Sequence, residues 1–436
     1  MKVHLLPALT GMCLIASPLA ADDWPAYRAD GKRTAVSAED IPAKLFANWT
    51  FKPRHAPRTA WPLPGEETPR MHTDRAYHAV VTGTTLIFGN NVNNHLHALD
   101  TRTGKMKWSF ATEGSVRFAP MIAGGFVYFG SDDGNVYCVD TADGTSIWKH
   151  RMGPSGERII GRSRLVSLWP VRTGVLVEDG IIYAAAGVFP YEGLYIKAID
   201  AKSGKTIWMN DTAGDQSWGQ LYGGMSPQGY IVASSDTLFV PAGRSMPAAF
   251  NKRTGKFKRF LNGGGKTGGS WAVMDGGQLF AGNNNQGTDT KVEFDGASGG
   301  SRGDQFSRYP STDMVLTKTI AYIATQKGIY AINREANQKA NRAVPALDKE
   351  SAALVKTIAA IRKRHKAAAD KSEELKVVSG ELNKATKRLS DIAQEKSALN
   401  TKRVKWYTPS TNLGPMVVAG GTLFAGGDGY LISLNI

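Results

Sequence analysis

The sequence predicts an all-β protein built as a β-propeller of four-stranded blades. Three observations carry this prediction: a recurring motif, a spacing of about 40 residues between its closest copies, and short apolar runs separated by glycine turns. Repeats of this length made of short strands are typical of propeller blades, whereas helical solenoids repeat pairs of helices. The fold class therefore rests on the repeat and not on any single residue.

The recurring motif is Ala-Leu-Asp-x-x-Thr-Gly followed by Trp, first seen from Ala98 to Trp108. Its acidic or amide residue returns at seven positions, namely Asp100, Asp140, Asp200, Asn251, Asp295, Asn333 and Asn435. The spacings between them are 40, 60, 51, 44, 38 and 102 residues, so the longer units carry insertions. Seven repeats are visible, and we expect seven or eight blades.

Each repeat contains the turns that a four-stranded blade needs. In the second copy, Met121 begins an apolar run, Gly124-Gly125 turns it, Phe126 begins the next run, and Asp133-Gly134 turns again. Short glycine-containing turns between alternating apolar runs are strong hairpin signals. The Asp-x-x-Thr-Gly motif then supplies the third turn, because Asp accepts backbone N–H groups and Gly adopts a positive φ. The tryptophan begins the outer strand.

This motif resembles the tryptophan-docking repeat of the pyrroloquinoline quinone (PQQ)-like β-propellers. That superfamily includes quinoprotein dehydrogenases and outer-membrane assembly scaffolds similar to BamB. The resemblance covers about Trp24 to Ile436 apart from one insertion, and it implies that the Trp of one blade lies between the Ala and the Gly turn of a neighbour. The residues to which it gives this structural docking role are Ala98, Gly104, Trp108, Gly144, Trp148, Ala198, Gly204, Trp208 and Trp406.

The chain begins like an exported protein. Residues 1–21 contain Lys2, an apolar stretch from Leu5 to Ala20 and a small-residue exit, which is the pattern of a secretory signal peptide. The stretch is too short to be a transmembrane anchor. We therefore expect a periplasmic or secreted protein with no transmembrane segment after cleavage.

The cysteine content leaves one free thiol in the mature chain. Only Cys13 and Cys138 are present, so after cleavage Cys138 is alone, and we expect it to be a small buried hydrophobic residue.

The net charge is +15, and residues 335–405 carry 17 Lys and Arg against 9 Asp and Glu. This excess does not require a nucleic-acid partner; it suggests contact with anionic envelope surfaces.

The basic stretch is also the one large insertion. Between Asn333 and Trp406 the chain places 72 residues where other copies have seven. The insertion is rich in Ala, Lys, Glu and Leu, and from Leu375 to Leu399 a series of positions, all apolar except Lys396, recurs at alternating intervals of three and four. This spacing is a heptad seam, so we predict an α-helical coiled-coil hairpin at residues 335–405.

The arms of this hairpin are expected to begin after Pro345 and to reverse near Ala369 to Ser372, with Gly380 as the alternative turn. Helices of about 24 residues would span about 36 Å. The hairpin is interpreted either as a tolerated insertion with a solvated charged face, or as a docking arm for a partner protein or for oligomerisation.

The predicted organisation is a signal peptide at 1–21, propeller blades at 22–334, the helical hairpin at 335–405 and the last visible blade at 406–436. Leu45 to Phe51 contains Trp49 and looks like an outer strand without its own hairpin. It would complete the blade formed by the end of the sequence and give seven blades. The alternative is a ring planned as eight blades with seven visible repeats.

Loops rich in Arg, Trp and Gly are the candidate ligand sites. Two long stretches between blades, 153–170 and 211–228, contain such residues. Arginine and tryptophan together can bind an anionic or sugar-like ligand through forked hydrogen bonds and stacking, while loop packing is the alternative interpretation. The candidate ligand-binding residues are Arg117, Arg162, Arg164, Trp169, Arg172 and Arg244.

Neither a catalytic group nor a metal site is predicted. His95 and His97 would lie on one face of a strand, with His72, Asp74 and His78 one hairpin away, but two spaced histidines are a weak metal signal. In quinoprotein dehydrogenases PQQ lies beneath a disulfide of adjacent cysteines, and a carboxylate base acts with a calcium ion. This chain has no cysteine pair, so we expect no cofactor, although the resemblance alone would allow PQQ with calcium.

The favoured hypothesis is an exported, non-catalytic propeller that acts as a protein-interaction scaffold. Its envelope protein partner would bind through the propeller face or through the helical hairpin 335–405. The alternatives are a PQQ-dependent quinoprotein oxidoreductase similar to alcohol dehydrogenases, and a propeller that binds carbohydrate or a small anion.

Overall fold

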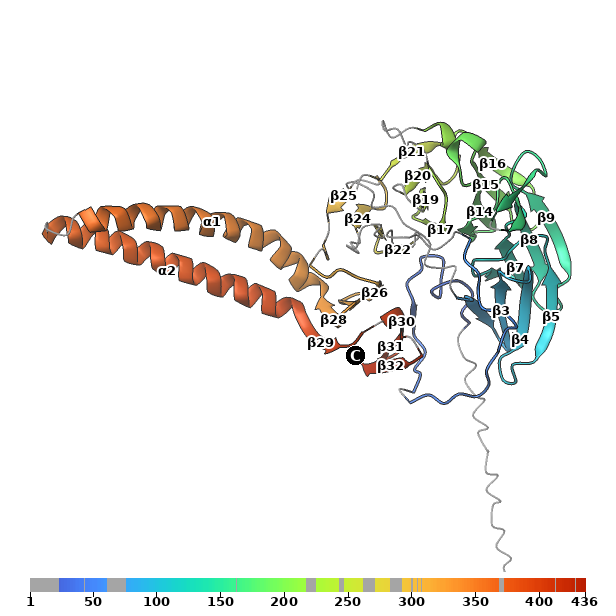
Figure 1. Cartoon of the computed structure of the whole chain (residues 1–436), viewed down its shortest axis with the longest axis horizontal. Coiled ribbons are helices and arrows are strands. Elements are labelled where there is room, and N and C mark those ends of the chain that lie inside the picture. Colours follow the sequence, from blue (N-terminus) through green and yellow to red (C-terminus); the bar gives the residue numbers. More distant parts are fainter. Residues whose placement is uncertain are drawn as a thin grey trace, which may run out of the picture.

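In the computed structural model of this chain, the described residues form seven four-stranded sheets arranged around a common axis (Figure 1). The structure describes residues 23–436 except 43, 61–75, 162, 217–224, 243–246, 262–270, 283–291, 299–300, 304, 307, 368–371, 412 and 428. The predicted signal peptide lies outside the described residues. The all-β propeller fold with an inserted pair of helices is therefore as the sequence predicts.

The first four sheets are formed by strands between Ala79 and Phe260. The first sheet contains β2 (Ala79–Thr82), β3 (Thr85–Asn90), β4 (His95–Asp100) and β5 (Met106–Ala111). The second contains β6 (Met121–Ala123), β7 (Phe126–Gly130), β8 (Asn135–Asp140) and β9 (Ser146–Arg151). The third contains β13 (Leu176–Glu178), β14 (Ile181–Ala186), β15 (Tyr195–Asp200) and β16 (Thr206–Asn210). The fourth contains β18 (Val232–Ala233), β19 (Thr237–Val240), β20 (Ala248–Asn251) and β21 (Phe257–Phe260).

Three further sheets complete the described ring. The fifth contains β22 (Ala272–Asp275), β23 (Gln278–Ala281), β24 (Val292–Asp295) and β25 (Ser301–Gly303). The sixth contains β26 (Asp313–Leu316), β27 (Ile320–Thr325), β28 (Gly328–Asn333) and β29 (Val404–Pro409). The seventh contains β1 (Val36–Ser37), β30 (Leu413–Ala419), β31 (Thr422–Gly427) and β32 (Leu431–Asn435).

Short elements lie between the sheets. The hairpin β10 (Arg158–Gly161) and β11 (Arg164–Ser167) lies between the second and third sheets. The pair β12 (Thr173–Gly174) and β17 (Gly229–Tyr230) is parallel, and the 3-10 turns are η2 (Pro190–Glu192) and η3 (Ala213–Asp215).

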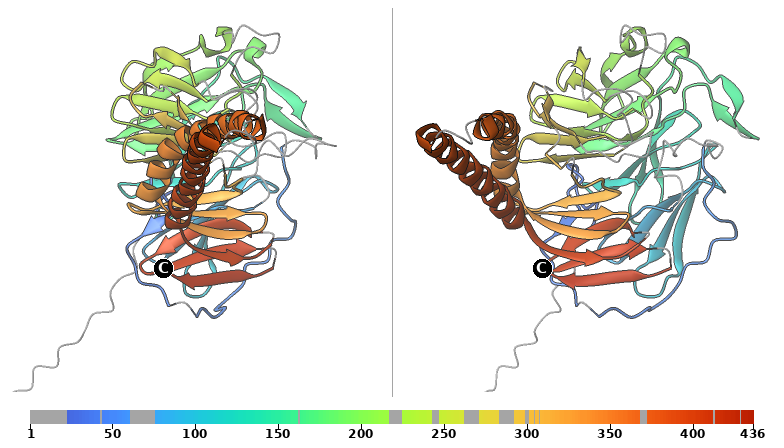
Figure 2. Two further views of the ribbon diagram at one scale, coloured as in Figure 1. Left: turned by 90° about the vertical axis from the view of Figure 1, so that its left-hand side faces the viewer. Right: turned by 60° about the vertical axis from the view of Figure 1, so that its left-hand side comes forward.

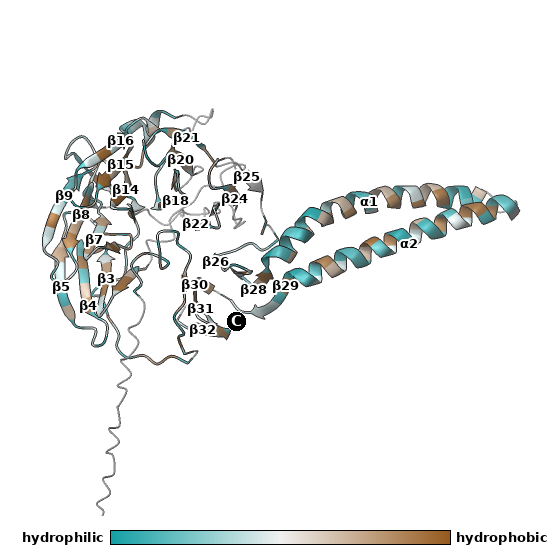
Figure 3. Cartoon of the chain, turned by 180° about the vertical axis from the view of Figure 1, so that it is seen from behind, coloured by the Kyte–Doolittle hydropathy of each residue, from teal (hydrophilic) through white to brown (hydrophobic). Residues whose placement is uncertain are grey.

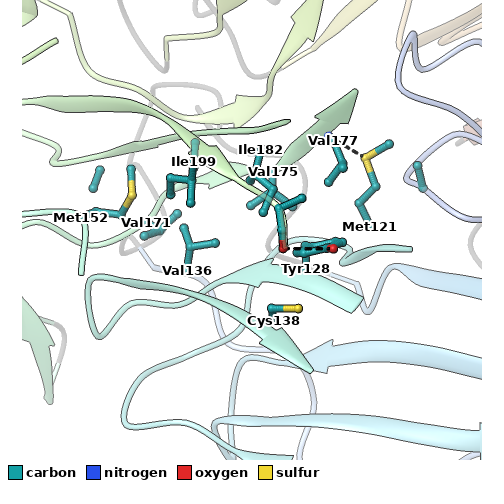
Figure 4. Close-up of a cluster of buried hydrophobic side chains, with 14 of the residues drawn as sticks. Met121, Tyr128, Val136, Cys138, Met152, Val171, Val175, Val177, Ile182 and Ile199 are labelled. Atoms are coloured by element: carbon teal, nitrogen blue, oxygen red, sulfur yellow. Dashed lines mark hydrogen bonds between the residues drawn. The ribbon is translucent and has the colours of Figure 1, made fainter. Parts of the chain in front are cut away.

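Apolar side chains fill the spaces between neighbouring sheets. Figure 4 shows the cluster between the second and third sheets, in which Met121, Cys138 and Ile182 are buried. Burial raises the pKa of the Cys138 thiol to about 12, so this cysteine is an inert part of the core.

The tryptophans join consecutive sheets in one direction around the ring. Trp108 packs on Gly144 of the second sheet, and its indole donates to the Thr141 carbonyl at 3.0 Å. Equivalent contacts are made by Trp148 on Gly204 and by Trp208 on Gly255. In each case the glycine has a positive φ and no room for a Cβ atom, so the motif requires glycine at this position.

Trp49 makes the same contact without lying in a strand. Its ring packs on Gly104, and its indole donates to the Thr101 carbonyl at 2.8 Å. Residues 44–51 form no strand, so the expected outer strand from Leu45 to Phe51 is not present in the described structure. The fourth strand of the seventh sheet is instead β1, which pairs in parallel with β30 at the inner edge.

Residues 23–37 are here called the axial segment: they pass through the centre of the ring (Figure 1) and end in β1, the inner strand of the seventh sheet. Figure 2 shows the ring and the helices from two further sides. Backbone hydrogen bonds join Trp24 to Val81 of the first sheet, Pro25 to Ile122 of the second and Lys32 to Met274 of the fifth. Val36 and Ser37 pair with the seventh sheet. The axial segment therefore touches the inner strands of sheets that lie far apart in the sequence.

Two buried arginines supply the remaining axial contacts. Arg33 donates to the carbonyl groups of Val175 and Ile231, next to the inner strands of the third and fourth sheets, at 3.1 and 3.3 Å. Arg28 binds both carboxylate oxygens of Asp313 in the sixth sheet, at 2.7 and 2.9 Å. Together with the backbone contacts, these bonds connect the axial segment to all seven sheets.

The insertion forms two antiparallel helices, α1 (Arg334–Ala367) and α2 (Ser372–Arg403). The predicted reversal near Ala369 to Ser372 falls largely outside the described residues, between the end of α1 and the start of α2, and Gly380 is inside α2. The helices are longer than predicted because α1 begins eleven residues before Pro345, which lies within it. The Asn333 side chain accepts the Ala336 amide at 2.8 Å, so the amide of the repeat motif acts as a helix cap.

Replacing Arg28 by Met tests the axial contacts. Because Asp313 would remain as a buried, unpaired charge, we expect a loss of about 3–5 kcal/mol of unfolding free energy in chemical denaturation. Arg388→Met is the matched control, since Arg388 pairs with Glu350 and Glu395 on the exposed hairpin and should cost at most about 1 kcal/mol. Equal losses in both variants would contradict an axial role.

A second pair of variants tests tryptophan docking. Gly144→Ala and Gly124→Ala both place alanine at a positive φ, but only residue 144 faces a tryptophan ring. We expect the first variant to lose about 1–3 kcal/mol more than the second, because its methyl group displaces Trp108. Thermal unfolding measures the difference, and equal midpoints would refute the docking interpretation.

Candidate functional site

The strand order divides the loops between two faces of the ring. Because the strands of a blade are antiparallel, the turn between its second and third strands lies on the same face as the connection to the next sheet. We call this the connection face. The tryptophan-docking turns and the helical hairpin emerge from the opposite face. The four predicted ligand-binding residues that the structure describes, Arg117, Arg164, Trp169 and Arg172, belong to segments of the connection face.

Asp132 is the centre of the polar network on this face. It lies in the turn between β7 and β8, and its side chain is fully buried. Arg117 contacts one carboxylate oxygen at 2.6 Å, and Arg172 contacts the other at 2.7 Å. Both guanidinium groups are also buried. One carboxylate therefore fixes the connection after β5, the turn after β7 and the segment before β12.

Arg164 fixes a neighbouring turn from the β10–β11 hairpin. Its guanidinium donates to the carbonyl groups of Asn91 and Val92, at 3.2 and 2.5 Å, and to the Asn94 side chain at 3.1 Å. Partial burial lowers the pKa of Arg164, and the nearby cations Arg58 and Arg117 lower it further. The hydrogen bonds thus hold this positive group against the first sheet.

A shallow hollow of about 550 Å³ lies beside Arg164. Its lining residues are His55, Ala56, Pro57, Arg58, Thr59, Val92 and Arg164. The Arg117 guanidinium donates to the Arg58 carbonyl at 2.9 Å, and the Arg58 amide donates to the Asn91 side chain at 3.0 Å. The sequence pointed to Arg164 but not to Arg58 or His55, since neither lies in a repeat motif.

Trp169 is placed inside the fold. Its ring packs on Gly153, only 6% of the residue is exposed, and its indole donates to the Glu192 carbonyl at 2.6 Å. It therefore joins the start of the inter-sheet connection to the turn after β14. Arg162 and Arg244 lie outside the described residues.

Apolar side chains project from the same face. Ile160 is 80% exposed and Leu165 is 55% exposed, both on the β10–β11 hairpin. Phe189 and Tyr191, in the turn after β14, stack on each other at 5.6 Å, and Tyr191 is 80% exposed. Sequence reasoning selected the arginines of these loops and missed the apolar residues between them. The adjacent isoleucines at 159 and 160 in a polar loop were the available signal.

The axial segment occupies the ring axis, and Cys138 is a single buried thiol among the described residues. Among the described residues no group of three or more His, Cys, Asp or Glu is placed to bind a metal ion. His95 and His97 stack at 5.6 Å, and burial with the nearby His95 lowers the pKa of His97 to about 4. His72 and Asp74 lie outside the described residues.

Comparison with known proteins identifies related sequences for part of the chain. Residues 49–193 match the family model of the outer membrane protein assembly factor BamB. The BamB of Yersinia pestis is 32% identical over 138 residues, which cover 30% of this chain and 32% of that protein. A tetrathionate hydrolase of Acidithiobacillus ferrooxidans is 26% identical over 188 residues, 41% of this chain and 34% of the relative. The chain thus matches about a third of the length of these curated relatives.

Solved structures show the same fold over more of the chain. A quinohemoprotein alcohol dehydrogenase from Comamonas testosteroni superposes with a TM-score of 0.51 at 14% identity, covering 95% of this chain and 71% of that one. BamB from Moraxella catarrhalis gives 0.46 at 12% identity, covering 80% and 81%. The superposition with the Comamonas testosteroni enzyme shows the propeller fold of this chain, and the family-model match over residues 49–193 shows the similarity to BamB that the repeats predict.

Asp132→Asn tests the connection-face network. The substitution keeps the side-chain shape but removes the buried negative charge that Arg117 and Arg172 both contact, so we expect about 3–5 kcal/mol of destabilisation. Hydrogen exchange should rise most around Arg117 and Arg172. Glu113→Gln is the control, because Glu113 forms exposed ion pairs with Lys149 and Arg158 and should cost at most about 1 kcal/mol. Uniform exchange changes across the ring would contradict the local role.

Proposed function

We propose that this chain is a non-catalytic propeller scaffold that binds a protein partner of the cell envelope through the connection face of its second and third sheets. The observation that carries the proposal is the exposed apolar group on the β10–β11 hairpin and the neighbouring turn: Ile159, Ile160, Leu165, Phe189 and Tyr191. Exposed aliphatic and aromatic side chains raised on a loop are typical of protein-binding surfaces.

The segments that carry these exposed side chains are anchored to the rest of the fold, which favours binding of a partner. Arg164 anchors one strand of the hairpin to the first sheet, and Trp169 links the segment after β11 to the turn that carries Tyr191. A loop that is already ordered loses less conformational entropy when a partner binds. The arginines that the sequence suggested as ligand contacts would then act as supports for a protein-binding surface.

The envelope location rests on the sequence and on the relatives. The amino-terminal pattern predicts export, and the name of the related BamB proteins places them in outer membrane protein assembly. Among the described helices none is both long and apolar enough to cross a bilayer. A protein partner in the cell envelope would agree with the predicted export and with the name of the BamB relatives.

Small-anion binding is the second candidate, and the hollow lined by Arg58 and Arg164 favours it. A ligand there would contact guanidinium groups and not the exposed apolar side chains. Calorimetry with inorganic phosphate separates the two functions, since the scaffold function requires no heat of phosphate binding.

Site-specific photo-crosslinking in cells that naturally make the protein tests the scaffold function. A photoreactive residue at Ile160 or Tyr191 should give a discrete protein adduct, and Leu165→Asp should weaken it. The controls are Met106 and Ile207, which are 48% and 51% exposed on the outer strands β5 and β16 and do not belong to the connection-face loops. Adducts of equal yield at all four positions, or at none of them, would overturn the proposal.

A further inference from the structure

The far end of the helical hairpin carries a concentration of positive charge. The last turns of α1 contain five consecutive basic residues, Arg362, Lys363, Arg364, His365 and Lys366. A helix of 34 residues is about 50 Å long, so these side chains lie far from the ring (Figure 1). In Figure 3 hydrophilic residues run along both helices and are interrupted by hydrophobic ones.

The five basic residues differ in whether a neighbouring side chain binds them. Arg364 pairs with Glu381, and His365 hydrogen-bonds to Ser379. Arg362, Lys363 and Lys366 are exposed and form no ion pair with any described residue. At about 100° per residue the three positions fall within one arc of about 100°, so their charge lies on one side of α1 near the end of the arm.

Most apolar side chains near this end of the arm pack between α1 and α2. Ile361 and Val378 are buried against each other's helix, which closes the seam. Val377 is the exception, because it is 60% exposed on α2 near the same end. The tip is therefore a convex surface and not a groove: the basic residues at the end of α1 outnumber the exposed carboxylates of Glu373 and Glu374 at the start of α2, and one apolar side chain is exposed.

We propose that this tip binds the headgroups of an anionic phospholipid bilayer. The end of two packed helices offers about 200 Å², because each helix is about 10 Å across, whereas a standard protein interface needs about 800 Å² per partner. A flat anionic membrane requires no such area, since each cation near its surface adds attraction independently. The arm would then set the distance between the ring and the bilayer.

This inference is independent of the connection-face proposal. The tip and the β10–β11 hairpin emerge from opposite faces of the ring, so one can fail without the other. A ring carried on a membrane-bound arm would keep its connection face free for a protein partner.

Vesicle co-sedimentation tests the inference with the purified full chain. We expect binding to vesicles of phosphatidylcholine mixed with phosphatidylglycerol, little binding to phosphatidylcholine alone, and loss of binding at high salt. The variant Arg362→Gln, Lys363→Gln, Lys366→Gln should bind about 100-fold more weakly, because each cation contributes about fivefold.

The matched control changes three exposed lysines in the middle of the arm, Lys349→Gln, Lys384→Gln and Lys387→Gln. This variant has the same net charge as the tip variant, and it should retain binding to within about fivefold. Circular dichroism checks that both variants keep their helices. Equal weakening in both variants, or no preference of the unaltered protein for the anionic vesicles, would overturn the proposal.

Discussion

The hydrogen bonds of the axial segment are the constraint on which the ring depends. The inner strand of each sheet has an edge that faces the axis, and its backbone groups need partners away from bulk water. The axial segment supplies them through its own backbone and through the guanidinium groups of Arg28 and Arg33. Asp313 also accepts the Met416 amide, so one buried carboxylate links the axis to the sixth and seventh sheets.

The repeat predicted most of the ring because its residues act locally. Asp100 accepts the amides of residues two and three positions later, Gly104 adopts the positive φ, and Trp108 lies opposite Ala98. These contacts recur wherever the motif recurs, so a short pattern specifies turn, register and docking together. The two helices were visible for the same reason, since their heptad spacing is also local.

The axis and the site could not be predicted in this way. Arg28 and Asp313 are 285 residues apart, and nothing in the sequence around Arg28 indicates its partner. The candidate arginines were recognised by residue type alone, but their orientation depends on Asp132 and on the carbonyl groups of the 91–94 turn. The early start of α1 was missed because Asn333 was assigned to a strand turn, whereas its amide also caps a helix.

The parallel pairing of β1 with β30 sets a condition on the order of folding. Val36 and Val418 are about 380 residues apart, so the seventh sheet acquires its inner strand only when nearly the whole chain is available. During synthesis the axial segment can meet the first two sheets early, through Trp24 and Pro25, while β1 waits for the last strands. Ring closure is therefore a late, non-local step, which topology makes slow, and during that interval the growing chain exposes strand edges that favour aggregation.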